Sequence, residues 1–182
     1  MTKTDRQFLA FDSSIAIHFA NAWPTPGQEQ DWADAQSALE LVDTYTLSLP
    51  SAVLTEILGA SPKAEHSSKH KSLTGAFTIL EYDEEAAVLA AGLLADALTR
   101  TGSKSLGELA ARFQMARQRI KLDLVIFATA ARWNCRLAVA DDDFSKWQER
   151  IGANSQLVSM QQLLSRRQQS LVFLDEARKG QR

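Results

Sequence analysis

The chain has 182 residues, which suits one domain with at most a modest extension. Hydrophobic residues make up 45% and charged residues 23%, a balance that excludes a disordered chain. The formal net charge of −2 argues against a general attraction to polyanions. The single cysteine excludes both an internal disulfide and a cysteine-based zinc site. We find no run near the roughly 18 apolar residues of a membrane span. With no secretory signal at the polar N-terminus, we expect a cytoplasmic protein without membrane contact.

Short apolar runs alternate with longer stretches of helical periodicity. Strands are predicted at residues 8–11, 46–49, 77–80, 136–140 and 157–158. Helices are predicted from residue 13, at 51–58, 84–99, 106–120 and 123–133, and after the capping-box pair Ser159 and Gln162. The polar stretch 63–72 is predicted to be a solvated loop. This order predicts a three-layer α/β/α sandwich with a mainly parallel sheet of four to five strands.

Two acidic sites follow predicted strands. Asp12 comes after the first strand, and Asp141 to Asp143 come after the fourth. In an open α/β sheet, ligands bind outside the carboxyl ends of the strands, where the strand order reverses. Each site also has a structural explanation, because aspartate caps helices and favours turns. The sequence leaves both explanations open for either site taken alone.

Two further carboxylates, Glu56 and Asp123, lie on predicted helices among apolar neighbours. Small or apolar residues flank Glu56 one turn away on either side, and Asp123 begins a helix that is nearly all apolar. A buried ionised carboxylate is costly unless it is paired or binds a cation. All four acidic positions fall on what should be one rim of the sheet. Mg²⁺ or Mn²⁺, which prefer oxygen ligands, would neutralise them.

Four blocks of the sequence together resemble the PIN domain family, and within it the VapC-type toxin ribonucleases. They cover Phe11 to Ile17, Leu49 to Leu58, Leu122 to Ala130 and Leu137 to Phe144, in the family's order and spacing. The chain departs from the family at residue 139, where valine stands in place of a frequent threonine or serine. It is also longer than compact toxin members. The resemblance spans roughly residues 8–158, and we assign 1–160 to a PIN-like nuclease domain and 161–182 to a C-terminal helical extension of it.

The resemblance implies Mg²⁺- or Mn²⁺-dependent hydrolysis of RNA phosphodiester bonds. Its catalytic acids are then Asp12, Glu56, Asp123 and Asp141, with Asp12 and Asp141 on neighbouring central strands. The same four residues and Asp143 would hold the metal ion, which lowers the pKa of a bound water and polarises the phosphate. Further implications are a type II toxin–antitoxin pair with a VapB-type antitoxin as partner, and a homodimer. The four tryptophans, not all of which a chain of this size must bury, agree with a dimer.

Basic residues gather between residues 100 and 121. Arg112, Arg117, Arg119 and Lys121 are candidates for RNA-backbone contacts outside the acidic pocket. A solvated helix face would explain the same cluster.

Two other functions compete with a nuclease. An aspartate-nucleophile phosphatase would use Asp12 but usually has Asp-x-Asp, and Ser14 occupies the second position here. A non-catalytic PIN-like module that binds RNA or a protein would not need all four acids. The three histidines, of which His66 and His70 lie in the polar stretch, form no Ser–His–acid or Cys–His arrangement with the rest of the sequence.

Overall fold

A single parallel sheet organises the computed structural model, which describes residues 7–21, 26–152 and 154–165. The strand order is β3-β2-β1-β4-β5, and every neighbouring pair is parallel. The strands are β1 (Gln7–Phe11), β2 (Tyr45–Pro50), β3 (Thr78–Leu80), β4 (Arg136–Val139) and β5 (Leu157–Ser159). The five strands predicted from the sequence are therefore confirmed, with small shifts at their ends.

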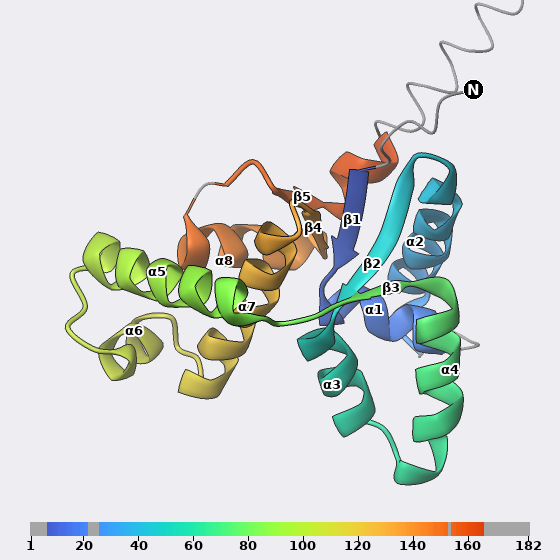
Figure 1. Ribbon diagram of the computed structural model, residues 1–182, viewed down its shortest axis with the longest axis horizontal. Coiled ribbons are helices and arrows are strands. Elements are labelled where there is room, and N and C mark those ends of the chain that lie inside the picture. The colour runs from blue at the N-terminus through green and yellow to red at the C-terminus, as the bar shows by residue number, and fades with distance from the viewer. Residues whose placement is uncertain (1–6, 22–25, 153, 166–182) are drawn as a thin grey trace, which may run out of the picture.

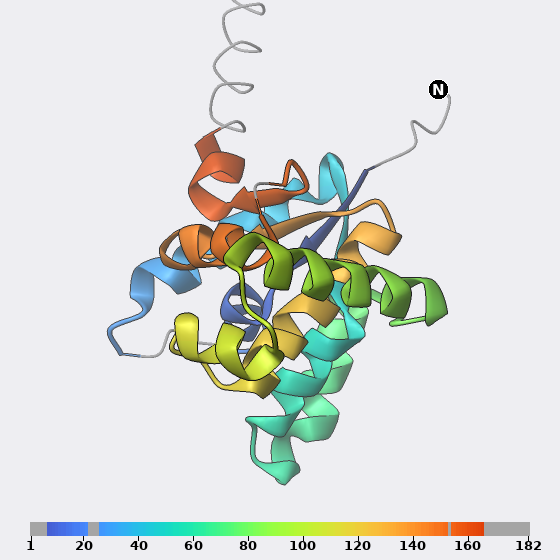
Figure 2. The same ribbon diagram turned by 90° about the vertical axis from the view of Figure 1, so that its left-hand side faces the viewer.

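Helices cover both faces of this sheet (Figure 1). One group consists of α1 (Ser13–Ala20), α2 (Glu29–Leu39), α3 (Ser51–Gly59) and α4 (His66–Ala76), with the short 3-10 turns η1 (Glu40–Asp43) and η2 (Lys63–Glu65). The other consists of α5 (Glu84–Thr101), α6 (Leu106–Arg112), α7 (Arg117–Arg132) and α8 (Asp141–Ile151). Figure 2 shows α5 lying across the near side of the molecule with α6 below it. The strand order explains this division, because parallel crossovers are right-handed as a rule and the chain adds strands in one direction up to β3 and in the other from β4 onward. The predicted three-layer α/β/α sandwich is confirmed.

The strand order reverses between β1 and β4. These two central strands pair with Ala10 opposite Leu137, and the Asp12 backbone N–H continues the ladder by donating to the Ala138 carbonyl at 3.0 Å. From β1 the chain continues to β2 on one side, whereas β4 lies on the other. Such a reversal opens a crevice at the carboxyl ends of the strands, where α/β proteins bind ligands.

Buried apolar side chains anchor the floor of this crevice. The β1 residues Leu9, Ala10 and Phe11 are fully buried. Phe11 makes edge-to-face contacts with Phe19 of α1 and Phe77, at ring-centroid distances of 5.1 and 5.9 Å. Aromatic pairs of this geometry stabilise a core by somewhat more than their buried area. The segment that leads into Asp12 is therefore held rigidly.

Two predictions about helices are wrong. The stretch 63–72 is helical instead of a loop, because the helix after Pro62 buries Leu73 against the core while its polar side chains face outward. The helix predicted at 106–120 is two helices, since α6 ends at Arg112 and Gln114 adopts a left-handed backbone with φ of 52°. The basic residues from Arg117 onward therefore belong to the same helix as Asp123.

The C-terminal part of the domain follows the predicted capping box. The Ser159 backbone N–H donates to Gln162 Oε1, and the Gln162 N–H donates to Ser159 Oγ, each at 3.3 Å. Residues 160–165 are helical, and the rest of the predicted extension, residues 166–182, lies outside the described residues. Within the described ranges, no helix has the length and apolar character to cross a membrane.

Candidate active site

Asp12 combines a structural role with an unused acceptor. Its Oδ1 caps α1 by accepting hydrogen bonds from the Ser14 N–H at 2.8 Å, the Ser14 hydroxyl at 2.5 Å and the Ile15 N–H at 3.3 Å. Its Oδ2 is buried without a hydrogen-bond partner. Burial raises the pKa of Asp12, the bonds from Ser14 and Ile15 oppose that rise, and the nearby charge of Asp143 adds to it. Capping therefore accounts for only one of the two carboxylate oxygens.

Asp123 lies in the middle of α7 with its side chain fully buried. Its Oδ2 is paired with the Arg150 guanidinium of α8, and Arg150 also lies over the Trp147 ring at 5.5 Å. Its Oδ1 lies 3.2 Å from Arg119 Nε but accepts no hydrogen bond. Burial raises the pKa of Asp123 to about 6; Arg150 and Arg119 oppose the rise, and the charge of Asp12 adds to it. Asp12 and Asp123 are thus close enough to repel each other.

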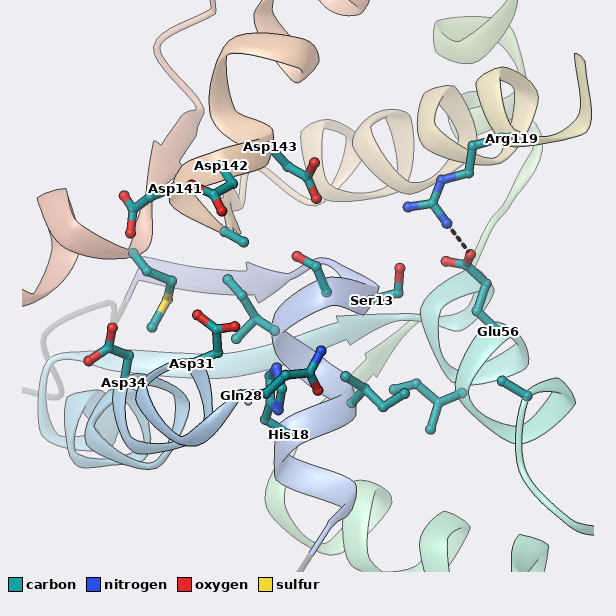
Figure 3. Close-up of a pocket in the computed structure, with 17 residues that line it drawn as sticks. Ser13, His18, Gln28, Asp31, Asp34, Glu56, Arg119, Asp141, Asp142 and Asp143 are labelled. Atoms are coloured by element: carbon teal, nitrogen blue, oxygen red, sulfur yellow. Dashed lines mark hydrogen bonds and ion pairs between the residues drawn. The ribbon is translucent and has the colours of Figure 1, made fainter. Parts of the chain in front are cut away.

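Glu56 reaches the same region from α3. Its Oε1 accepts a hydrogen bond from Arg119 Nη1 at 2.7 Å, whereas its Oε2 is buried without a hydrogen-bond partner. Arg119 therefore joins Glu56 of α3 to Asp123 of α7, and Figure 3 shows its guanidinium directed at the Glu56 carboxylate. The apolar helix faces predicted around Glu56 and Asp123 are real, and arginine is the pairing cation at both.

The acidic triplet forms the first turn of α8. Of its members, Asp143 raises the pKa of Asp12, so it is the one that interacts with the buried carboxylates; its Oδ1 also pairs with Lys146 at 2.8 Å. Both oxygens of Asp141 instead accept from the Gln161 N–H at 3.2 Å. Asp141 thus lines the same crevice with its carboxylate turned to the chain after β5.

These carboxylates surround a pocket of about 520 Å³ at the carboxyl edge of the sheet (Figure 3). Glu56, Asp141 and Asp143 line it directly, while Asp12 and Asp123 are buried nearby. The polar and acidic residues that line it also include Ser13, Ser14, His18, Gln28, Asp31, Asp34, Arg119 and Asp142. The structure therefore gathers Asp12, Glu56, Asp123 and Asp143 into one region, with Asp141 at its edge.

Several residues of this region were not found by sequence reasoning. His18 is buried with its Nδ1 unbonded, and Asp31 and Asp34 come from α2, a helix that the sequence analysis does not predict and that Gln28 directly precedes. The spacing of four residues between Arg119 and Asp123 is a signal for an ion pair only if both lie on one helix, and the predicted helices 106–120 and 123–133 separate them. Arg150 had none, because only the packing of α8 brings it to Asp123.

The predicted RNA contacts separate into three places. Arg117 and Lys121 line a second, smaller pocket beside α6, where the Arg117 guanidinium lies over Gly107. Arg112 donates to the Thr101 carbonyl at 3.0 Å, at the end of α5. Arg119 is engaged with the carboxylates. Of the four predicted RNA contacts, Arg117 and Lys121 are therefore the two that share one exposed surface.

The carboxylate oxygens of this site are suitable ligands for a hard divalent cation, but they are not yet grouped closely enough to bind one. Asp12 Oδ2, Glu56 Oε2 and Asp123 Oδ1 are buried oxygens without hydrogen bonds, and carboxylate oxygen is the ligand type that Mg²⁺ and Mn²⁺ take. Within the described ranges, no three His, Cys, Asp or Glu side chains are grouped closely enough to hold a metal ion as they stand. Arg119 lies between Glu56 and Asp123 and is paired with both.

The raised pKa of Asp123 predicts how stability depends on pH. Because the folded protein binds this proton more tightly than the unfolded chain, the group's contribution is largest below pH 3.8 and is lost as pH rises to about 6. The loss is on the order of 3 kcal/mol. We expect Asp123→Asn, which cannot titrate, to gain stability relative to wild type as pH rises from 4 to 7. Denaturant unfolding in metal-free buffer measures this, and a difference that does not vary with pH would contradict it.

Solved structures of toxin–antitoxin complexes share the fold. A VapBC2 complex from Rickettsia felis bound to a promoter DNA fragment matches with a TM-score of 0.55 and 17% identity, over 84% of this chain and 98% of that one. A DNA-bound VapBC from Salmonella typhimurium matches with a TM-score of 0.54 and 16% identity, over 85% of this chain and 98% of that one. A toxin–antitoxin complex from Klebsiella pneumoniae matches with a TM-score of 0.50 and 14% identity, over 84% of this chain and 97% of that one. No protein-family model matches the sequence, and no curated protein matches it significantly. The chain thus has the PIN-like fold that its four sequence blocks predict.

Proposed function

We propose that this protein is a metal-dependent ribonuclease that hydrolyses RNA phosphodiester bonds. The observation that carries the proposal is a set of three carboxylates at the carboxyl edge of the sheet, Asp12, Glu56 and Asp123, each with one buried oxygen that accepts no hydrogen bond. Burying carboxylate oxygens that accept no hydrogen bond is costly, even where an arginine pairs with the same carboxylate, so a protein that needed only a rigid fold would gain nothing from this arrangement. A cation that binds there compensates for the cost.

In this proposal Asp12, Glu56 and Asp123 hold Mg²⁺ or Mn²⁺, with Asp143 and Asp141 at the edge of the site. The cation supplies charge neutralisation at the phosphate and a lower pKa for the attacking water. The protein supplies orientation. The Ser14 hydroxyl and N–H fix Oδ1 of Asp12, which leaves Oδ2 for the ligand, and Arg150 fixes Oδ2 of Asp123, which leaves Oδ1.

The basic side chains of Arg117 and Lys121 would contact the RNA backbone outside the acidic pocket. They lie one turn apart on α7, the helix that also carries Asp123. Lysine and arginine at such a surface supply binding that does not depend on sequence and that weakens with salt. Arg112 is less suited to this role because it is bonded to the end of α5.

We further propose that the ribonuclease is the toxin of a type II toxin–antitoxin pair that acts in the cytoplasm with a VapB-type antitoxin as its partner. The support is the shared fold with three toxin–antitoxin complexes, each covered over nearly its whole matched chain. A non-catalytic PIN-like module and an aspartate-nucleophile phosphatase remain the competing functions. Under either of these functions, the wild-type protein would show no metal-dependent RNA cleavage, or the cleavage would not change when one carboxylate charge is removed.

Asp12→Asn separates catalysis from capping. Asparagine caps a helix nearly as well as aspartate, so we expect the fold to persist, with equal or slightly higher stability in chelator because a buried charge is removed. Cleavage of an RNA panel with Mn²⁺ should fall by more than about 100-fold, since residues that only support metal ligands already cost about 10- to 100-fold. Asp96→Asn on the exposed side of α5 is the matched control. Undiminished cleavage by Asp12→Asn, or full wild-type activity in excess chelator, would end the proposal.

The homodimer that the PIN resemblance implies has a candidate surface. Trp147 is buried, but Trp133 is 40% exposed, and its Nε1 donates to the Glu81 carbonyl at 3.2 Å, beside the exposed Tyr82. Val88 on α5 is exposed as well. Trp32 is partly buried, and Trp23 lies outside the described residues.

We expect light scattering at tens of micromolar to give twice the chain mass of 20.1 kDa. Val88→Asp should lower that mass toward the monomer, because a charge at an apolar interface is costly to bury. A monomeric mass for wild type would contradict the dimer.

A further inference from the structure

Arg119 stands where a cation is needed. Its Nη1 lies 2.7 Å from Glu56 Oε1 and its Nε lies 3.2 Å from Asp123 Oδ1, so one guanidinium group neutralises carboxylates from two helices. Helix geometry explains the reach to Asp123, since residues four apart lie on the same face. Within the described part of the chain, these ion pairs are the polar contacts of the Arg119 side chain.

The two arginines of the site differ in their freedom to move. Arg150 is 6% exposed, lies against Trp147 and holds Asp123 Oδ2. Arg119 is 39% exposed and lines the pocket itself. Figure 3 shows its side chain entering from α7 at the edge of the site. Arg119 can therefore leave its carboxylates by rotating into the pocket, whereas Arg150 would require α8 to move.

Arg119 holds two carboxylates that a metal ion would use, at the free oxygen itself in Asp123 and at the opposite oxygen in Glu56. Asp123 Oδ2 is already paired with Arg150, which leaves Oδ1, the atom beside Arg119 Nε. Glu56 offers Oε2, but its carboxylate is held by Arg119 through Oε1. A guanidinium and a divalent cation at these oxygens would repel each other, so they cannot occupy the site together.

We propose that Arg119 is an exchangeable internal cation, which holds Glu56 and Asp123 in the metal-free protein and leaves them when a divalent metal ion binds. This inference rests on the proposed metal-dependent function and adds that the Arg119 guanidinium competes with the metal ion for the two carboxylates. Breaking the two ion pairs reduces the affinity for metal. The released guanidinium then faces the pocket, where an RNA phosphate offers it a new anionic partner. Arg119 would thus pair with the carboxylates first and contact the RNA backbone after the metal ion has displaced it.

Calorimetric titration with Mn²⁺ alone, at pH 7.5 and fixed salt, tests this exchange. Arg119→Gln removes the competing charge and should bind Mn²⁺ about tenfold more tightly than wild type, a size appropriate to partly exposed ion pairs. Arg119→Lys keeps the charge and should stay near wild type. Arg132→Gln is the matched control, because Arg132 ends the same helix, is 33% exposed and pairs with two other carboxylates, Asp83 and Glu85. Its affinity should not change.

A second measurement uses the wild-type protein and does not depend on how the glutamine variant folds. The ¹⁵N–¹H signal of Arg119 Nε, assigned by its loss in Arg119→Lys, should move toward that of a free arginine as Mg²⁺ is added. The Arg150 signal should keep its paired position. Thermal melts complete the test: Arg119→Gln should melt below wild type in chelator and be stabilised more than wild type by Mn²⁺.

The outcomes separate this inference from the proposed function. Equal or weaker Mn²⁺ binding by Arg119→Gln, with an Arg119 signal that Mg²⁺ leaves unchanged, would overturn the exchange while the metal-dependent function stands. Absence of Mn²⁺ binding by wild type and variant alike would overturn both. Tighter binding by the glutamine variant together with a released Arg119 signal supports the exchange.

Discussion

The burial of Asp123 is the constraint on which the rest of the site depends. A fully buried carboxylate in the middle of an apolar helix must be compensated, and the pairing comes from Arg150 on α8 and Arg119 one turn earlier on α7. Removing one partner of such a pair is far more costly than never having had the pair. The Arg150 pair therefore ties α8, which begins with the acidic triplet, to α7 and sets where Asp143 lies relative to Asp12.

The same constraint explains how several carboxylates can share one pocket. Asp12, Glu56 and Asp123 approach one another from three elements, and two guanidinium groups offset their mutual repulsion. One of these groups is locked against Trp147 and the other borders the pocket. The proposed exchange rests on this difference between the two arginines. In that exchange, an RNA phosphate is the proposed alternative partner of the Arg119 guanidinium.

Much of this could be predicted from local pattern. The short buried runs around Phe11 and Val139, each followed by aspartate, indicated two strands whose carboxyl ends meet at one edge, and the sheet order confirms it. The apolar neighbours of Glu56 and Asp123 indicated that their charges need compensation. These features depend on periodicity and on residues within one turn, which a single sequence displays.

What could not be predicted depends on tertiary contacts. The left-handed backbone at Gln114 divides a continuous helical pattern, so Arg119 and Asp123 come to share one helix. The polar stretch before Leu73 has no amphipathic signal, yet docking of Leu73 makes it helical. Arg150 has a polar helical neighbourhood in the sequence, and only the crossover of α8 buries it at Asp123. The sequence therefore indicated that the buried carboxylate needs a compensating cation, but it did not indicate which residues supply it.

The central claim is that a divalent cation binds among Asp12, Glu56 and Asp123. Anomalous diffraction from crystals grown with Mn²⁺ tests it most directly, because the ion is located independently of any assay. We expect one strong anomalous peak within ligand distance of Asp12 Oδ2 and Asp123 Oδ1, with the Arg119 guanidinium displaced from both carboxylates. A saturated crystal with no peak there, and with Arg119 still bridging Glu56 and Asp123, would contradict it.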